Sequence, residues 1–453
     1  MNKKRKISLS TTQIILLSFV IAIGVGSLLL ALPISSASGK AVPYLDALFT
    51  ATTATCVTGL VTLPTATTWS VFGQVVILIL IQIGGLGIIT IMSGFMLMLN
   101  RKMGIGDKLL LQDAFNLNTM SGLAKFIRNI LLGTLIIECI GALLYMTVFV
   151  PDFGARGIWI SVFNSVSAFC NAGIDIIGEN SLYAYAQNPV INAVTSALII
   201  LGGIGYIVWW DVLRVFRTRT AKNRRIFRHL TLHSKIAIVS TLVLIFGGGL
   251  LLFIVEYNNT DTIGGLSLGG KIQVSLFQSV TTRTAGFASV PQENLTGAGA
   301  IISMVLMLIG GSPVGTAGGI KTVTATVLMC SALSTVRNKD TATLFNRAIS
   351  ADSIRKAVAV AATFVCILVS SATLLSMTTD APTLDVLYEA MSATATVGLS
   401  RNVTSGLDSL GKIIIIFTMY FGRVGPISLA VALGSRGKDQ NAISDPVEEI
   451  SIG

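Results

Sequence analysis

The chain has 453 residues, of which 52% are hydrophobic and 12% are charged, and its mean hydropathy is +0.78. This composition excludes an ordinary soluble domain and indicates a protein with several membrane-spanning helices. The net charge of +11 does not indicate nucleic-acid binding, because the basic residues gather at the ends of apolar segments instead of forming one basic, aromatic surface.

The chain begins with basic residues and an apolar stretch that is too long for a secretion signal, so we expect a membrane helix there. A helix needs about 20 apolar residues to cross a bilayer. Eight segments meet this condition, at 12–32, 70–99, 127–150, 190–213, 236–256, 299–333, 355–377 and 411–434. The sixth is longer than one crossing needs and contains several glycines, so we expect an interruption there.

Arginine and lysine are concentrated after the second, fourth and sixth spans and near both termini. Because positively charged loops stay on the cytoplasmic side, both termini are expected inside the cell. The connections on the other side each contain a short, partly apolar segment that ends in threonine, serine and glycine. Such a segment is too short to cross the membrane and is typical of a re-entrant pore loop.

These short segments are four copies of one pattern, at 49–60, 163–174, 276–287 and 388–399. Their glycines Gly59, Gly173, Gly286 and Gly398 are separated by 114, 113 and 112 residues. We therefore predict an all-α membrane protein of four tandem helix, pore-loop, helix repeats with eight transmembrane helices around a central pore. The predicted limits of the four repeats are 12–99, 125–215, 234–336 and 353–434, with an interrupted second helix in the third repeat. A cytosolic tail is predicted at 435–453.

A second glycine element recurs in the helix after each loop, at 83–87, 201–205, 309–313 and 421–425. Small residues at these positions also allow close helix contact. Four extended loops that meet on an axis can replace the water shell of an alkali cation with rings of backbone carbonyls. Glycine permits the backbone angles that this needs, and the uncharged surroundings argue against carboxylate ligands.

The motifs at 55–60, 282–287, 310–321 and 394–399 resemble those of the Trk/Ktr/HKT potassium transporters, over nearly the whole chain. The resemblance is strongest to KtrB-type subunits, without a distinction between KtrB and KtrD. It implies that the four glycines lie in the selectivity filter and that glycine at the first position, where some plant relatives have serine, favours potassium. We expect potassium at filter carbonyls that include Val57, Thr58, Asn171, Ala172, Thr284, Ala285, Thr396 and Val397. The second loop, with Phe169, Cys170 and Asn171, departs most from the threonine-rich pattern.

The interrupted sixth span is expected to form a gate below the filter. Arg423 occupies the place of the second glycine in the fourth copy, and a charge inside the membrane indicates either a function or a buried ion pair. For Glu138 the alternatives are a transport role and a buried partner interaction or local helix packing. The expected gating residues are Gly310, Gly311, Ser312, Pro313, Gly315, Thr316, Gly318, Gly319, Lys321 and Arg423.

The stretch 315–322 approaches a phosphate-binding motif but has Ile320 where that motif requires glycine, so we expect no nucleotide on this chain. The resemblance implies a homodimer in the bacterial cell membrane under a cytosolic ring of nucleotide-binding subunits of the KtrA or KtrC type. The basic segment 214–235 could contact that ring or the membrane lipid. The sequence leaves open whether sodium is co-transported; a secondary transporter of another small solute is the alternative, and no enzyme motif is present.

Overall fold

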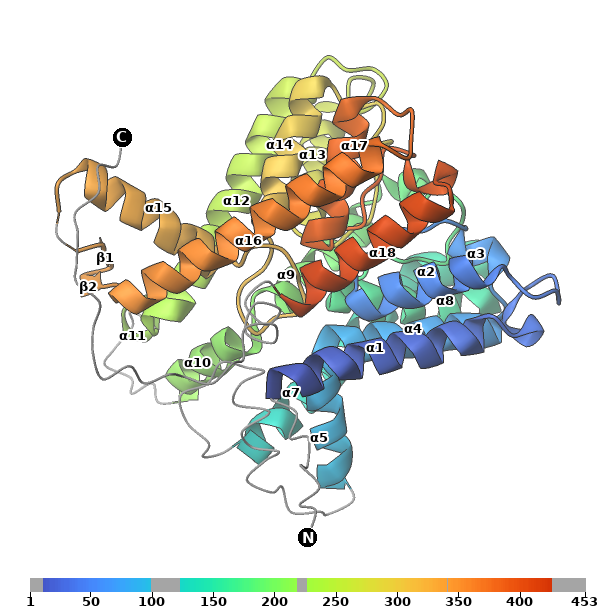
Figure 1. Ribbon diagram of the computed structural model, residues 1–453, viewed down its shortest axis with the longest axis horizontal. Helices are drawn as coiled ribbons and strands as arrows, with labels where there is room; N and C mark the ends of the chain where they lie inside the picture. The colour runs from blue at the N-terminus through green and yellow to red at the C-terminus, as the bar shows by residue number, and fades with distance from the viewer. Residues whose placement is uncertain (1–10, 99–122, 218–225, 340, 426–453) are drawn as a thin grey trace, which may run out of the picture.

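A computed structural model describes residues 11–98, 123–217, 226–339 and 341–425. The regular secondary structure of the described residues is helical except for one antiparallel hairpin of β1 (Thr343–Leu344) and β2 (Arg347–Ala348). The same succession of helices occurs four times: a long helix, a shorter helix, and then a helix that breaks or ends at a glycine-rich segment (Figure 1).

The first helix of each unit is continuous. These helices are α1 (Thr11–Leu30), α7 (Leu123–Phe153), α12 (Leu232–Glu256) and α16 (Ala351–Ser376). Each is long and apolar enough to cross a membrane, and most of its apolar window is not buried inside the protein. On α12, for example, Val243, Phe246 and Leu250 are exposed. Such faces suit contact with lipid, because the surrounding hydrocarbon has the same polarity as the side chains.

The second helix of each unit is short and buried. These helices are α2 (Tyr44–Cys56), α8 (Ala155–Cys170), α13 (Leu268–Thr281) and α17 (Thr383–Ala395). They contain 13, 16, 14 and 13 residues. A helix rises about 1.5 Å per residue, so they span roughly 20–24 Å and cannot cross a hydrocarbon core of about 30 Å. We call them pore helices 1 to 4.

The last part of each unit is broken more often than the sequence predicted. It consists of α4 (Val71–Leu86) with α5 (Ile88–Met98), α9 (Pro189–Gly203) with α10 (Tyr206–Arg217), α14 (Gly297–Leu308) with α15 (Thr322–Val336), and α18 (Ser409–Val424). We expected an interruption only in the sixth span, and this was wrong for the second and fourth. The reason is local: Gly87 and Gly205 have φ of 84° and 94°, which no α-helix accommodates, and α10 is bent by 92° from α9.

Residues 426–434 of the eighth predicted span and the tail 435–453 lie outside the described residues. The remaining helical elements are α3 (Thr65–Thr68), α11 (Ile226–His229) and the short turns Pro33–Ser35, Tyr183–Tyr185 and Thr404–Gly406. Side-chain oxygens cap the first turns of many helices and fix where they begin. The capping residues are Ser70, Asn188, Thr231, Ser267, Thr296, Ser350 and Asp408.

The four units are arranged in a closed ring. Helix α4 packs against α8, α9 against α13, and α14 against α17, so the last helix of each unit contacts the pore helix of the next. The ring closes because α18 packs against α2 of the first unit. Figure 1 shows α2 and α18 beside each other although they lie at opposite ends of the chain. The C-terminal ends of the pore helices therefore face one common axis.

Candidate functional site

A residue in the left-handed conformation follows each pore helix, directly in units 1, 2 and 4 and three residues after the helix end in unit 3. Val57, Asn171, Thr284 and Thr396 have φ of 55°, 59°, 64° and 53°. Three of these are β-branched residues, for which the left-handed region is strained. Gly59, Gly173, Gly286 and Gly398 follow two positions later, all with positive φ. Strained backbone that recurs at four equivalent positions indicates a shared functional geometry.

The four glycines lie against one another at the centre of the ring. A methyl group added to any of them would collide with a carbonyl oxygen of the next unit. Gly59 faces Ala172 O and Gly173 faces Ala285 O, while Gly286 faces Val397 O and Gly398 faces Thr58 O. Only glycine allows this approach, and it brings the carbonyls of the residues preceding the glycines around one axis.

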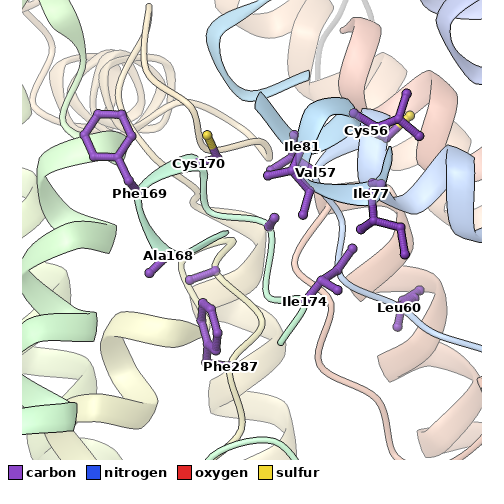
Figure 2. Close-up of a cluster of buried hydrophobic side chains, with 14 of the residues drawn as sticks. Cys56, Val57, Leu60, Ile77, Ile81, Ala168, Phe169, Cys170, Ile174 and Phe287 are labelled. Atoms are coloured by element: carbon purple, nitrogen blue, oxygen red, sulfur yellow. The ribbon is translucent and has the colours of Figure 1, made fainter. Parts of the chain in front are cut away.

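The side chains of this layer point away from the axis. Thr58, Ala172, Ala285 and Val397, which precede the four glycines, are all fully buried. Figure 2 shows Val57 with Ile77 and Ile81 of α4, and Phe169, Ile174 and Phe287 around the neighbouring segments. Because apolar side chains fill the space behind the segments, the backbone supplies the polar atoms that face the axis.

Hydroxyl groups that the sequence alone did not single out support three of the four segments. Gly59 N donates to Thr53 Oγ1 at 3.0 Å, and Gly398 N donates to Ser392 Oγ at 3.0 Å. In the third segment Thr281 Oγ1 donates to Phe287 O at 2.7 Å. The corresponding Ser167 Oγ in the second segment has no hydrogen-bond partner. A hydroxyl residue five or six positions before each glycine is the signal that could have identified them.

A recess of about 210 Å³ opens on one side of the glycine ring and is lined by all four glycines. Asp175, Glu179 and Glu293 are among its other lining residues. Burial raises the pKa of the Asp175 carboxyl to about 6, against hydrogen bonds from Ser181, Ile177 and Gly178 that lower the pKa. Acidic groups at this mouth make the recess attractive to cations.

The second glycine element packs behind the pore helices. Gly84, Gly202 and Gly422 lie so close to the carbonyls of Thr55, Phe169 and Thr394 that no side chain would fit. Their equivalent in the third unit, Gly310, lies instead against Gly318 O of the loop 309–321. The third unit therefore keeps the glycine but uses it within a loop.

The loop 309–321 crosses the other side of the glycine ring. Its two ends pair with each other, since Gly310 N donates to Ile320 O at 3.0 Å. Its middle contacts the second unit, where Ser312 N donates to Gly203 O and Thr316 Oγ1 donates to Phe169 O. Gly318 N donates to Thr284 Oγ1 of the third unit, and Gly318 also touches Thr396 of the fourth. A segment that contacts three pore-helix ends lies across their common axis.

Two of the predicted charged residues hold this loop directly. Arg423 donates to Thr316 O at 2.5 Å and to Gly84 O at 2.6 Å. Lys321 Nζ donates to Ala317 O at 2.6 Å. Among the described residues, the ion pairs do not include Arg423, so its charge is balanced by carbonyl oxygens and not by a carboxylate. The functional alternative for Arg423 thus fits the geometry better than a buried ion pair.

Glu138 lies away from the glycine ring, on α7. Its carboxylate accepts a hydrogen bond from Gln82 Nε2 at 3.3 Å, and its backbone oxygen accepts one from Ser165 Oγ at 2.6 Å. Cys170 of pore helix 2 is adjacent to it. These contacts join α4, α7 and α8, which favours the packing alternative for Glu138.

Comparison with known proteins gives one consistent result. The profile of the TrkH cation transport protein family matches residues 2–440. The potassium/sodium uptake protein NtpJ of Enterococcus hirae is 39% identical, over 100% of this chain and 99% of that protein. The Ktr system potassium uptake protein B of Bacillus subtilis is 38% identical over 97% and 96%, and protein D of the same system is 30% identical over 98% of each.

Among solved structures, the potassium transporter TrkH from Vibrio parahaemolyticus superposes with a TM-score of 0.75, at 15% identity, over 96% of this chain and 86% of that chain. This match confirms the predicted fold class, an all-helical protein that crosses the membrane several times.

Proposed function

Because the chain belongs to the TrkH family of cation transport proteins, we propose that it is the potassium-conducting membrane subunit of a Ktr-type uptake system. The chain is a transporter subunit and not an enzyme. The observation that carries the proposal is the ring in which each of Gly59, Gly173, Gly286 and Gly398 faces a carbonyl oxygen of the next unit. Such a ring suits selection of a dehydrated alkali cation.

The selectivity filter consists of the three residues that end with each glycine in the four units. Potassium binds to the carbonyl oxygens of the positions 57–59, 171–173, 284–286 and 396–398 as its hydration water is removed. No carboxylate is needed at this level, because rings of carbonyl dipoles supply the negative potential. The acidic recess gathers cations before they enter.

The loop 309–321 is the gate, and the described conformation is closed. Supporting this is its position across the axis directly behind the filter, held by Arg423, by Gly202 and Gly203, and by Thr284. The fixed charge of Arg423 next to the pathway also opposes the passage of cations. Opening requires these hydrogen bonds to break together, so a regulatory subunit can open the gate by displacing the loop 309–321.

Regulation comes from a soluble nucleotide-binding ring on the cytoplasmic face, with two copies of this chain in the complex. This proposal is supported by the similarity to Ktr system proteins and by the basic segments after the even-numbered spans, because positively charged loops favour the cytoplasmic side. Helix α10 is a suitable contact, because Tyr206 N at its start donates to Val314 O of the gate at 3.0 Å.

Sodium is either a coupled ion or a competitor. The name of the Enterococcus hirae relative includes both potassium and sodium, whereas that of the Bacillus subtilis relative includes only potassium. Glycine at all four filter positions favours potassium as the main substrate.

The test is potassium uptake in a bacterial strain that lacks its own uptake systems, with the regulatory subunit co-expressed and with sodium present or absent. Potassium-dependent growth and saturable uptake are expected. Membrane insertion without potassium uptake, together with uptake of another small solute, would instead support a secondary transporter.

A further inference from the structure

Arg283 is a buried arginine for which the mechanism above has no role. Its side chain is 7% exposed, and it lies at the end of pore helix 3, three residues before Gly286. The residues at the same distance from the other filter glycines are Cys56, Cys170 and Ala395, none of which is charged. A single charge at membrane depth is costly and indicates a function.

The contacts of Arg283 are made to the gate and its surroundings. Arg283 NH2 donates to Gly310 O at 3.1 Å and lies 3.5 Å from Thr241 Oγ1 on α12. The ion pairs among the described residues do not include Arg283, and its Nε has no hydrogen-bond partner. Gly310 is the second residue of the loop 309–321, directly after the C-cap of α14, so the guanidinium holds the start of the gate.

The neighbouring residue holds the other end of the same loop. Thr284 Oγ1 accepts a hydrogen bond from Gly318 N at 3.0 Å, while Thr284 itself has the left-handed φ of 64° that starts the third filter segment. Arg283 and Thr284 thus connect the N-terminal and C-terminal parts of the loop 309–321 to one filter segment. Movement of the gate away from the axis must change the hydrogen bonding of that segment.

The two arginines hold the gate from opposite sides of the ring. Arg423 lies between the fourth and first units, where it reaches Gly84 O. Arg283 lies between the third and second units, beside Gly203 and Asn171 at a small cavity. In a ring of four units these two interfaces face each other across the axis. One guanidinium holds the middle of the gate and the other holds its start.

We propose that Arg283 is a positioning residue that locks the start of the gate to the third filter segment and thereby couples gate opening to the potassium affinity of the filter. The inference rests on the proposed function, because it requires the loop 309–321 to be a gate. It predicts a difference between the two arginines: Arg423 contacts the gate and Gly84, whereas Arg283 contacts the gate from the position directly before the third filter segment.

The experiment measures potassium uptake by the full chain in a strain without its own uptake systems, with and without the regulatory subunit, normalised to the amount in the membrane. For Arg283→Gln we expect uptake without the regulatory subunit to rise about threefold, since loss of one hydrogen bond shifts a two-state equilibrium by roughly that factor. The potassium concentration for half-maximal uptake should rise about threefold, and Arg283→Lys should give intermediate values. Arg423→Gln should raise the rate with little change in half-saturation.

Thr241→Val is the matched control, because it removes the long contact at 3.5 Å and leaves the Gly310 contact intact; a phenotype equal to that of Arg283→Gln would overturn the assignment to Gly310. Unchanged half-saturation and unchanged dependence on the regulatory subunit in Arg283→Gln would overturn the coupling. If Arg283→Gln does not reach the membrane, Arg283→Lys decides by the same two readouts. A parent chain that takes up no potassium would overturn the proposed function, which is a different result from an active parent with unaffected variants.

Discussion

The proposed filter layer has the same backbone pattern in all four units, whereas the proposed gate layer differs from unit to unit. In the filter layer all four units share a left-handed residue, a buried small or apolar residue and a glycine with positive φ. In the layer behind it, the first, second and fourth units place a glycine against their own pore helix, while the third unit inserts a loop and the fourth has Arg423 in place of a second glycine.

This difference follows from what each layer must do. An ion on an axis is best coordinated by equivalent oxygens from all sides, so every unit keeps the same backbone. A gate needs one movable element and fixed points that hold it, so the units diverge. The predictions below test whether the filter is symmetric in function and whether the gate depends on single residues.

The largest effect is expected in the filter. Gly59→Ser places a side chain where Ala172 O lies 2.6 Å from an added methyl group, which disturbs the carbonyl ring. We expect the preference for potassium over sodium to fall by about tenfold or more, a cost of roughly 1.4 kcal/mol in discrimination. Uptake of both ions by the variant and the parent measures this. Gly247→Ser is the control because Gly247 has open space around it; equal ratios for Gly59→Ser and the parent would contradict the filter assignment.

Deletion of residues 312–318 tests the gate layer as a whole. The deletion removes the segment that crosses the axis, so we expect the maximal uptake rate to rise about fivefold and to depend less on the regulatory subunit. Uptake at saturating potassium, with and without that subunit, is the measurement. A stable deletion variant with parental rate and full regulation would show that the gate lies elsewhere.

Arg423→Gln tests one fixed point while the loop stays in place. It removes the charge and weakens the bonds to Thr316 O and Gly84 O, so the rate should rise about threefold, which is less than in the deletion. Folded protein with no gain in rate would favour a purely structural role. Size-exclusion chromatography of the purified variant separates that outcome from misfolding.

Thr53→Val and Ser167→Ala each remove a hydroxyl group six residues before a filter glycine, and the two hydroxyl groups differ in their hydrogen bonding. Thr53 Oγ1 accepts the N–H of Gly59, whereas Ser167 Oγ has no partner. Loss of the first should destabilise the protein by about 1–3 kcal/mol, while loss of the second should be nearly neutral. Thermal unfolding of both variants in detergent, with potassium present, provides the comparison. Equal shifts for the two variants would contradict the stated role of Thr53.

The smallest effect concerns the acidic recess. The pKa of Asp175, raised by burial to about 6, means that its carboxylate is charged at an external pH of 7.5 and mostly protonated at 5. The loss of this negative charge should raise the potassium concentration for half-maximal uptake about twofold as the pH falls through 6. Asp175→Asn should remove the pH dependence in this range. An unchanged pH profile in Asp175→Asn would assign the dependence to another group.

Much of the fold could be read from the sequence, because membrane proteins place strong constraints on local composition. Apolar length predicts crossings, basic loops predict orientation, and the regular spacing of Gly59, Gly173, Gly286 and Gly398 predicts four equivalent units. The sequence also identified 310–321 as an element that could not continue a helix. These features depend on local composition and on the spacing of motifs along the chain, and not on which residues meet in space.

Tertiary structure alone decided which atoms meet. Thr316 contacts the carbonyl of Phe169 across 147 residues, and Arg423 contacts Gly84 across 339, and no local pattern reports such contacts. Gly87 and Gly205 have positive φ and break two predicted spans. In the sequence they cannot be distinguished from glycines that only allow close helix packing. Arg283 gave no signal in the sequence for the same reason: its carbonyl partner Gly310 lies 27 residues further along the chain in the loop 309–321, and only the folded third unit brings the two together.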